Sequence, residues 1–285
     1  MTTEPGACNR TGDHDATYVV SFPKAGRTWL RFILGQAIVR HLALESIADV
    51  EDILDVTSLR QLSPRAPMVH FTHECKPDFR RPDELPVDKD GFRQHRVILL
   101  VRDPRDIVVS HYFERTHRYA LWAEVYEHDP ALASVSHRLH PYTGSLSEFL
   151  REEVGSLHTI VEYYNIWASH FHVPRRFLML RYEDLHETPV AAARSALHVL
   201  GFPTVSTAAI KAAIQACAFQ RMRALESAHA ISSPRLRPGN PYIPASFKVR
   251  RGRVHGFLDY LSDSDVAYAS DLINRNMAPI YGYRT

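Results

Sequence analysis

The stretch SFPKAGRTWLRFIL, residues 21–34, decides the fold. A short β-rich run, residues 18–22, leads into it, and apolar residues then recur at roughly helical spacing over residues 28–41. The turn between them contains Lys24 and Gly26. A glycine-containing turn from a strand into a helix presents backbone N–H groups and the positive helix end to an anion. The sequence therefore predicts a phosphate-binding loop at this turn.

Two other interpretations of this turn remain open at this point. The loop of nucleotide hydrolases requires the pattern GxxxxGK[ST], whereas here Lys24 precedes Gly26 and Thr28 lacks the usual spacing of the magnesium-binding hydroxyl. Taken alone, the stretch also fits an ordinary strand-to-helix turn with a surface lysine. The function of this turn therefore has to be inferred together with the other motifs in the chain.

The rest of the chain alternates strand and helix patterns. Short apolar runs at residues 68–72, 97–101 and 177–181 read as strands. Helical patterns occupy residues 105–118, 147–154, 157–171, 190–200 and 207–219. Alternation of this kind predicts an α/β fold, a single domain with a central parallel sheet flanked by helices. We expect a flexible tail over residues 1–16, the domain over residues 17–285, and long surface loops over the site at residues 119–144 and 221–249.

Composition limits the classes of function. The chain has 285 residues and a net charge of only +2, so no global basic field indicates nucleic acid, and any anion site must be local. Its three cysteines form no CxxC pair, which predicts neither a disulfide framework nor a metal site and favours a reducing cytoplasm. Neither a signal-peptide pattern nor an apolar run long enough to cross a membrane is visible, so we expect a cytoplasmic protein without a membrane partner.

Four motifs, in order, resemble those of the cytosolic sulfotransferase family that uses 3′-phosphoadenosine 5′-phosphosulfate (PAPS). FPKAGRTWL resembles its 5′-phosphosulfate loop, PKSGTTWL, and LLVRDPRDIVVSHY, residues 99–112, resembles its 3′-phosphate strand and helix. RYEDL, residues 181–185, and FKVRRGRVHGFLDYLS, residues 247–262, resemble its tyrosine-containing strand end and its late RKGxxGDWKxxFT segment. The resemblance implies the sulfotransferase fold with a P-loop-like phosphosulfate loop. It also implies an enzyme that moves the sulfuryl group of PAPS to a small-molecule hydroxyl by in-line displacement.

The resemblance implies a donor site made from distant segments. Its expected members are Lys24, Ala25, Gly26, Arg27 and Thr28 around the 5′-phosphosulfate, Arg102, Ser110, Arg250, Arg251 and Gly252 around the 3′-phosphate, and Trp29, Tyr182 and Phe219 around the adenine. Lys24 is expected to contact the bridging oxygen and steady the departing phosphate. Arginine suits bidentate phosphate contact. The alternatives without a binding function are that Lys24 is an ordinary surface lysine, that Arg250 and Arg251 are a surface arginine pair, and that the aromatic residues belong to the core.

His73 is the candidate general base. The segment HFTHECKP ends the second expected strand, and its Thr72–His73 pair resembles the KTHLP segment of the family, whose histidine takes the acceptor proton. Histidine titrates near neutral pH and suits this role. His70, nearer the strand interior, is expected to be structural. The catalytic pair is therefore expected to be Lys24 and His73.

The chain departs from the family pattern at several positions. Phe71 replaces the lysine before the Thr-His pair, which removes a cation from the reacting centre, and we hypothesise that Arg27 restores one. Loss of no more than about twofold in turnover in Arg27→Ala would contradict this hypothesis. Ala25 and Arg27 replace two hydroxyl residues, and Cys217-Ala218 replaces a Thr-Ser pair. The dimerisation segment of animal members is not apparent, so the oligomeric state stays open.

Two rival functions are weighed against this one. A P-loop-like, nucleotide-dependent small-molecule kinase would need the GK[ST] step and a magnesium-binding carboxylate, for which only Asp103 follows an apolar strand. A non-catalytic nucleotide-binding module would not need both Lys24 and His73. The sequence does not identify the acceptor beyond a hydroxylated small molecule.

Overall fold

A computed structural model of the chain describes residues 16–228 and 234–284. Its centre is a parallel sheet of four strands in the order β2-β1-β3-β4. The strands are β1 (Thr17–Ser21), β2 (Val69–Thr72), β3 (Arg96–Val101) and β4 (Arg176–Arg181). Each lies within about a residue of its predicted bounds, which confirms the predicted α/β fold with a central parallel sheet. Residues 17–21 and 97–101 are buried, as expected for strands covered on both faces.

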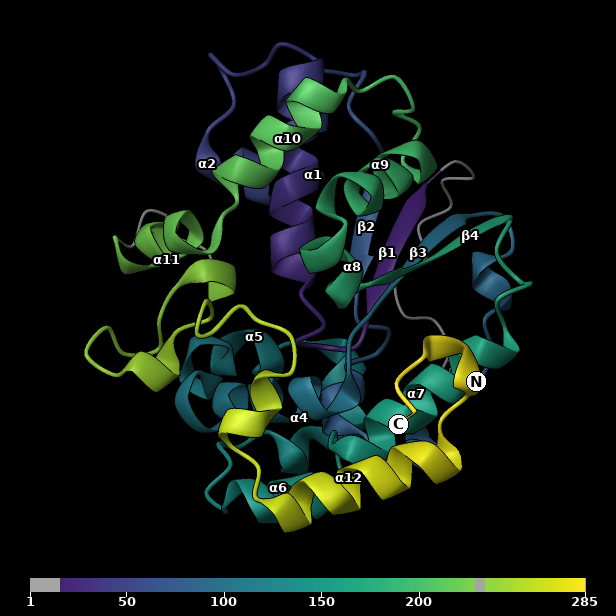
Figure 1. Cartoon of the computed structure of the whole chain (residues 1–285), viewed down its shortest axis with the longest axis vertical. Helices are drawn as coiled ribbons and strands as arrows, with labels where there is room; N and C mark the ends of the chain where they lie inside the picture. Colours follow the sequence, from purple (N-terminus) through teal and green to yellow (C-terminus); the bar gives the residue numbers. More distant parts are fainter. Residues whose placement is uncertain (1–15, 229–233, 285) are drawn as a thin grey trace.

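Helices cover the sheet on both sides (Figure 1). On one side pack α1 (Arg27–His41), α2 (Val50–Leu54), α8 (Tyr182–Glu187), α9 (Pro189–Val199) and α10 (Thr207–Ala216). On the other side lie α4 (Pro104–His117), α6 (Leu146–Arg151), α7 (Leu157–Ser169) and α12 (Asp263–Asn276). The remaining helices are the short α3 (Leu59–Leu62) and α5 (Ala123–Glu127), together with α11 (Phe219–Ser227).

The short elements between these helices are 3-10 turns. They are η1 (Pro77–Phe79), η2 (Pro82–Glu84), η3 (Asp90–Phe92), η4 (Tyr119–Leu121), η5 (Pro130–Arg138), η6 (Pro234–Leu236), η7 (Pro244–Ser246), η8 (Gly256–Asp259) and η9 (Pro279–Tyr281). None of the helices in the described part of the chain is long and apolar enough to cross a membrane. The expected tail, residues 1–16, lies outside the described residues apart from the buried Ala16.

Strand register explains where a site forms. Ser21 pairs with Leu100, Val20 with Thr72, and Val101 with Arg181, so all four strands end at one edge of the sheet. The chain leaves β1 toward β2 on one side, and β3 lies on the other side, which makes a topological switch point. Ligands of open parallel sheets bind outside the carboxyl ends of the strands at such a point.

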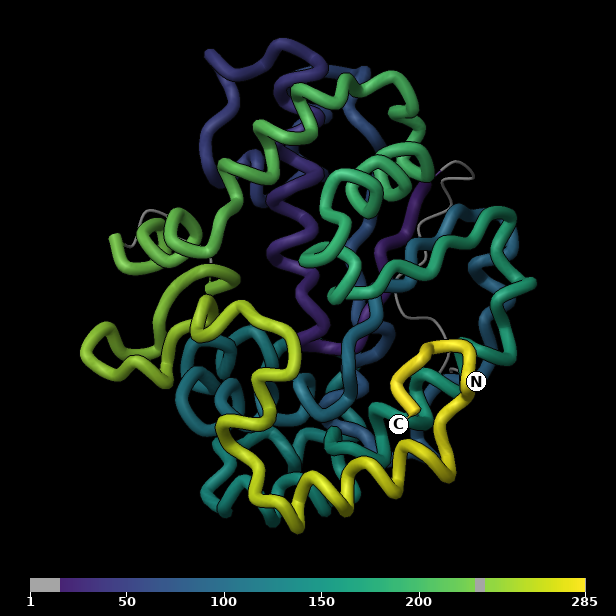
Figure 2. The backbone as a smooth tube through the Cα atoms, viewed as in Figure 1, coloured from purple at the N-terminus to yellow at the C-terminus, as the bar shows by residue number. Residues whose placement is uncertain are grey.

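Two expected surface loops contain more structure than the sequence indicated. The segment 119–144 contains η4, α5 and η5 and joins a small second core made of Phe79, Tyr119, Tyr126, Leu132 and Val135. The segment 221–249 opens inside α11, and Figure 2 shows the chain from residue 234 onward beside the α4 and α5 region. The expected helix 207–219 is wrong at its end, because it stops at Ala216 and α11 begins at Phe219. The residues between the two helices are Cys217 and Ala218, so neither glycine nor proline marks this break in the sequence.

One prediction about the cysteines is wrong. Cys75 is disulfide-bonded, while Cys217 is buried and free. Cys8 is outside the described residues. The spacing argument failed because a disulfide joins residues that are close in space and distant in sequence. The cytoplasmic location stays a prediction, without support from the cysteines.

Candidate active site

A cavity of about 1150 Å³ opens at the carboxyl ends of the strands. Thirteen of the fourteen predicted site residues line it, and Ala25, which is buried beneath the loop, does not. The cavity thus brings together the N-terminal loop, the residues at the ends of β2 and β3, α4, α8, α11 and the late segment 247–253. The lining members are Lys24, Gly26, Arg27, Thr28, Trp29, His73, Arg102, Ser110, Tyr182, Phe219, Arg250, Arg251 and Gly252.

The loop after β1 has the backbone of an anion cradle. Lys24 and Gly26 both adopt left-handed conformations, with φ of 73° and 98°. A Cβ atom on Gly26 would lie 2.4 Å from Cδ2 of Tyr182, so only glycine permits this approach. Gly26 is the N-cap of α1 and no side chain caps it. The positive end of a 15-residue helix therefore begins at the cavity wall.

Lys24 forms a buried ion pair with Glu114 of α4. The Nζ atom lies 2.5 Å from Oε2 of Glu114, which also accepts a hydrogen bond from Nε of Arg118 at 3.1 Å. Nζ of Lys248 lies 3.8 Å from the same oxygen. Burial opposes ionisation of this carboxyl, but the three cations outweigh burial and hold the pKa of Glu114 well below its usual range. Glu114 thus organises the positive charge around Lys24, a feature that the sequence analysis missed.

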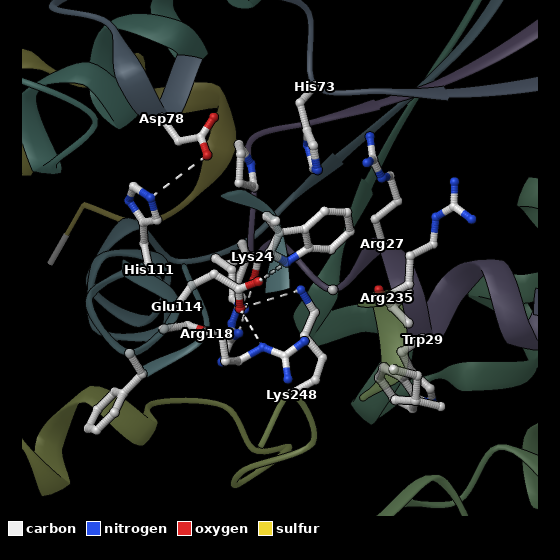
Figure 3. Close-up of a pocket in the computed structure, with 18 of the residues that line it drawn as sticks. Lys24, Arg27, Trp29, His73, Asp78, His111, Glu114, Arg118, Arg235 and Lys248 are labelled. Atoms are coloured by element: carbon white, nitrogen blue, oxygen red, sulfur yellow. Dashed lines mark hydrogen bonds and ion pairs between the residues drawn. The ribbon is translucent and has the colours of Figure 1, made fainter. Parts of the chain in front are cut away.

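His73 is held in one tautomer. Its Nδ1 atom lies 2.8 Å from the carbonyl oxygen of Ser21, so Nδ1 carries the proton and donates it. The remaining ring nitrogen, Nε2, is then unprotonated, and Figure 3 shows the ring pointing into the cavity. Burial, and then the charge of Arg27, hold the pKa of His73 well below its usual range. The imidazole is therefore neutral at physiological pH.

Arg102 connects three walls of the cavity. Its guanidinium donates to the carbonyl oxygens of Lys24 and Arg253, each at 3.2 Å, and lies 4.2 Å from the ring centroid of Tyr182. Its Nε atom is buried without a hydrogen-bond partner among the described residues. Ser110, eight positions on, lines the cavity from α4 as predicted. Arg102, which follows β3, and Ser110, on α4, therefore both face the cavity that the late segment also lines.

The late segment closes the cavity with arginines. Arg250 lies 3.8 Å from the ring centroid of Phe113, and its NH1 is buried without a hydrogen-bond partner in the described part of the chain. Arg251 is exposed, and its Nε donates to the hydroxyl of Tyr260 at 3.2 Å. Gly252 has φ of 59°, and a Cβ atom there would lie 2.4 Å from Cδ2 of Phe219. Two arginine side chains and an aromatic ring thus meet at this wall.

The predicted aromatic residues form two groups. The rings of Trp29 and Tyr182 meet edge to face, with centroids 5.7 Å apart, and Nε1 of Trp29 donates to the carbonyl oxygen of Cys217 at 3.0 Å. Phe219 packs instead against Gly252 and is 41% exposed. All three line the cavity, and Tyr182 lies beside Arg102.

The position of Phe71 reveals a cation that the sequence analysis missed. The guanidinium of Arg31, one turn along α1 from Arg27, lies 4.0 Å from the ring centroid of Phe71. Positive charge is therefore present beside the phenylalanine that replaces the lysine of the family pattern. In the described residues, no group of three His, Cys, Asp or Glu side chains is arranged to hold a metal ion.

Comparison with known proteins decides the family. The family model described as "Sulfotransferase domain" matches residues 14–280. The chain belongs to the sulfotransferase family. The prediction of a transferase that takes its sulfuryl group from PAPS is confirmed at the level of this family, and the kinase alternative is not favoured.

Individual relatives of this sulfotransferase are distant. The chain is 21% identical to the flavonol 3-sulfotransferase of Flaveria bidentis over 281 residues, which cover 91% of this chain and 81% of the relative. A mouse sulfotransferase complexed with PAP matches with a TM-score of 0.55 at 18% identity, covering 93% of this chain and 85% of that one. Retinol dehydratase in complex with androsterone and the inactive cofactor PAP gives a TM-score of 0.57 at 15% identity, covering 92% and 80%. These structures support the fold assignment.

Proposed function

We propose that this sulfotransferase moves the sulfuryl group of PAPS to a hydroxyl group of a small molecule by in-line displacement, with His73 as general base and Lys24 as the cation at the leaving oxygen. One observation carries the proposal. His73 presents an unprotonated Nε2 to the same cavity that Lys24 and the anion cradle line. A base and a leaving-group cation on one cavity are what transfer to a hydroxyl requires.

The cavity fits a donor with several negative charges. Nε of Arg102 and NH1 of Arg250 are buried without hydrogen-bond partners among the described residues, which is costly unless an anion satisfies them. They would hold the 3′-phosphate together with Ser110, Arg251 and Gly252. The cradle, through the backbone N–H groups of residues 24–28 and the ammonium group of Lys24, would hold the 5′-phosphosulfate, while Trp29, Tyr182 and Phe219 would border the adenine. When bound, PAPS supplies the activated sulfuryl group.

The roles of the two catalytic residues follow from their surroundings. His73 accepts the proton of the acceptor hydroxyl at Nε2 while the acceptor oxygen forms its bond to sulfur. Ser21 holds the ring for this role by accepting the hydrogen bond from Nδ1. Lys24 stabilises the negative charge that remains on the phosphate oxygen when its bond to sulfur breaks. Glu114, now paired with Lys24, competes for that cation until the donor binds.

An acceptor screen with sulfur-labelled PAPS tests the function. The wild-type enzyme should label at least one phenol, alcohol or sugar, and His73→Ala should lower turnover by about two to four orders of magnitude while PAPS affinity changes little. His70→Ala is the matched control, because it removes another histidine nearby, in β2, the strand that His73 directly follows. Near-normal turnover in His73→Ala would exclude His73 as the base.

A thermal-shift titration separates the rival functions. A ligand that binds only the folded state raises the melting temperature. We expect stabilisation by PAP and PAPS, and none by ATP with magnesium. Stabilisation by ATP with magnesium alone would favour the kinase. Binding of PAPS without sulfur transfer to any acceptor would favour the non-catalytic module.

A further inference from the structure

Three arginines of the cavity wall lie near one another, and the charge of one of them, Arg27, acts on the candidate base. Arg27 and Arg31 lie one turn apart on α1, Arg235 lies in η6, and all three line the cavity. We call them the arginine cluster. NH1 of Arg31 lies 3.6 Å from Oδ1 of Asp55, and NH1 of Arg235 lies 3.9 Å from Oδ2 of the same carboxylate. One partly exposed carboxylate thus faces two guanidinium groups at distances too long for hydrogen bonds.

Two atoms of the cluster lack partners. NH1 of Arg27 and NH1 of Arg31 are both buried, and neither has a hydrogen-bond partner among the described residues. Arg31 is only 5% exposed. Burial, followed by the charge of Arg235, lowers the pKa of Arg31 to about 10. Buried guanidinium groups that repel one another and lack acceptors are stabilised by an added anion.

The cluster lies on the acceptor side of the cavity. Trp29, which contacts Tyr182 of the adenine group, projects from the opposite face of α1, because residues two positions apart on a helix point in nearly opposite directions. Arg31 instead packs on Phe71 of β2, the strand that His73 directly follows. Figure 3 shows Arg27 and Arg235 near each other, with Arg27 toward His73. An anion bound here would therefore adjoin the reacting hydroxyl.

From this arrangement we infer that the acceptor carries a negatively charged group in addition to its reacting hydroxyl, and that the arginine cluster binds this group. A carboxylate fits best, because the planar fork of arginine matches carboxylate geometry and Asp55 already offers a carboxylate to two members. The inference rests on the proposed function insofar as the acceptor binds beside His73. It narrows the acceptor from any hydroxylated small molecule to a hydroxylated acid.

Binding to the PAP-saturated enzyme tests the inference without turnover, because PAP has no sulfuryl group to transfer. The probes are para-hydroxybenzoate, para-hydroxyphenylacetate and para-coumarate, each paired with its uncharged methyl ester, and the readout is calorimetric affinity. The wild type should bind an acid at least about tenfold more tightly than its ester. Arg31→Gln should weaken binding of the acid by about ten- to a hundredfold, while Arg31→Lys should weaken it less.

Two further variants separate binding from structural damage. Asp55→Asn removes the competing carboxylate and should tighten binding of the acid several-fold, a gain that damage to the fold would not produce. Arg65→Gln makes the same charge change at an exposed arginine outside the cavity and should match the wild type. PAP affinity of every variant serves as the folding control.

The outcomes separate this inference from the proposed function. Equal affinity for acids and esters, failure of every acid to bind, or loss of affinity in Asp55→Asn overturns the inference. Sulfation of esters but not acids overturns it as well, while the proposed function stands. Acids that bind through the cluster but never receive sulfur support the anion site and contradict the proposed function. If Arg31→Gln lowers turnover of acid and ester equally, the cluster acts on the transferred group instead.

Discussion

The surroundings of His73 suit the role of general base that we propose for it. The carbonyl of Ser21 fixes the proton on Nδ1, and burial together with the nearby charge of Arg27 disfavours the imidazolium. A base that stays neutral well below the ordinary histidine pKa remains active in mildly acidic solution. The positive charge of Arg27, which would attract an anionic acceptor, thus also keeps the base unprotonated.

The pH profile follows from this shift. The unprotonated ring is the active form, so kcat/KM should fall as pH drops through the lowered pKa of His73. The acid limb should therefore lie below pH 6.5, the ordinary value for histidine. Arg27→Gln should move the limb toward higher pH, because it removes a nearby positive charge. An acid limb above the ordinary histidine pKa in the wild type would contradict this account of the base.

Lys24 should affect the chemical step more than binding. Lys24→Met removes the cation that we propose stabilises charge on the leaving oxygen, so turnover at saturating PAPS should fall by about two to three orders of magnitude. Single-turnover kinetics would measure this step directly. Lys248→Met is a suitable comparison, because Nζ of this lysine also faces Glu114, at 3.8 Å. The Lys248→Met substitution should lower turnover less than Lys24→Met. A rise in the KM for PAPS alone would make Lys24 a binding residue.

At the scale of elements, Glu226 fastens the late segment to the domain. This fully buried carboxylate of α11 accepts hydrogen bonds from the backbone nitrogens of Lys248, at 2.5 Å, and Val249, at 2.8 Å. It also pairs with NH1 of Arg118, at 3.4 Å, which comes from the end of α4. One side chain thus joins three segments, immediately before Arg250 and Arg251.

Removing this carboxylate should lower both the free energy of unfolding and the affinity for PAPS. Glu226→Ala leaves two backbone N–H groups without their partner and removes one of the two carboxylates that pair with Arg118, which should lower the free energy of unfolding by about 3 to 5 kcal/mol. Denaturant titration measures this, and PAPS affinity should fall in parallel. The exposed Glu187→Ala is the control and should change little. Stability of Glu226→Ala close to that of the wild type would mean that the late segment is held by other contacts.

The sequence predicted the strands well because each is a short apolar run between polar turns. It predicted the site loop because a glycine turn between a strand and a helix has few structural alternatives. It failed at residues 119–144, because the contacts of that segment with Phe79 join parts of the chain that are distant in sequence. Glu114 and Arg31 were missed for a related reason. Each reads as an ordinary helix residue until packing places it beside Lys24 or Phe71.

At the scale of the whole molecule, the proposed donor site depends on the topology. Arg102 follows a central strand, Ser110 lies on the next helix, and Arg250 comes from a segment about 140 residues later. The parallel sheet brings the strand ends together, and Glu226 holds the late segment against them. The central claim is that these distant residues form one site for the 3′-phosphate of PAPS.

Calorimetry with two nucleotides tests this claim most directly. PAPS carries the 3′-phosphate and adenosine 5′-phosphosulfate lacks it, so the affinities of both are measured for the wild type, Arg102→Ala, Arg250→Ala and Arg251→Ala. Each variant should bind PAPS about ten- to a hundredfold more weakly, while its affinity for adenosine 5′-phosphosulfate should hardly change. Equal loss of both nucleotides in every variant would show that the arginines support the fold or the 5′ end, and would contradict the 3′-phosphate site.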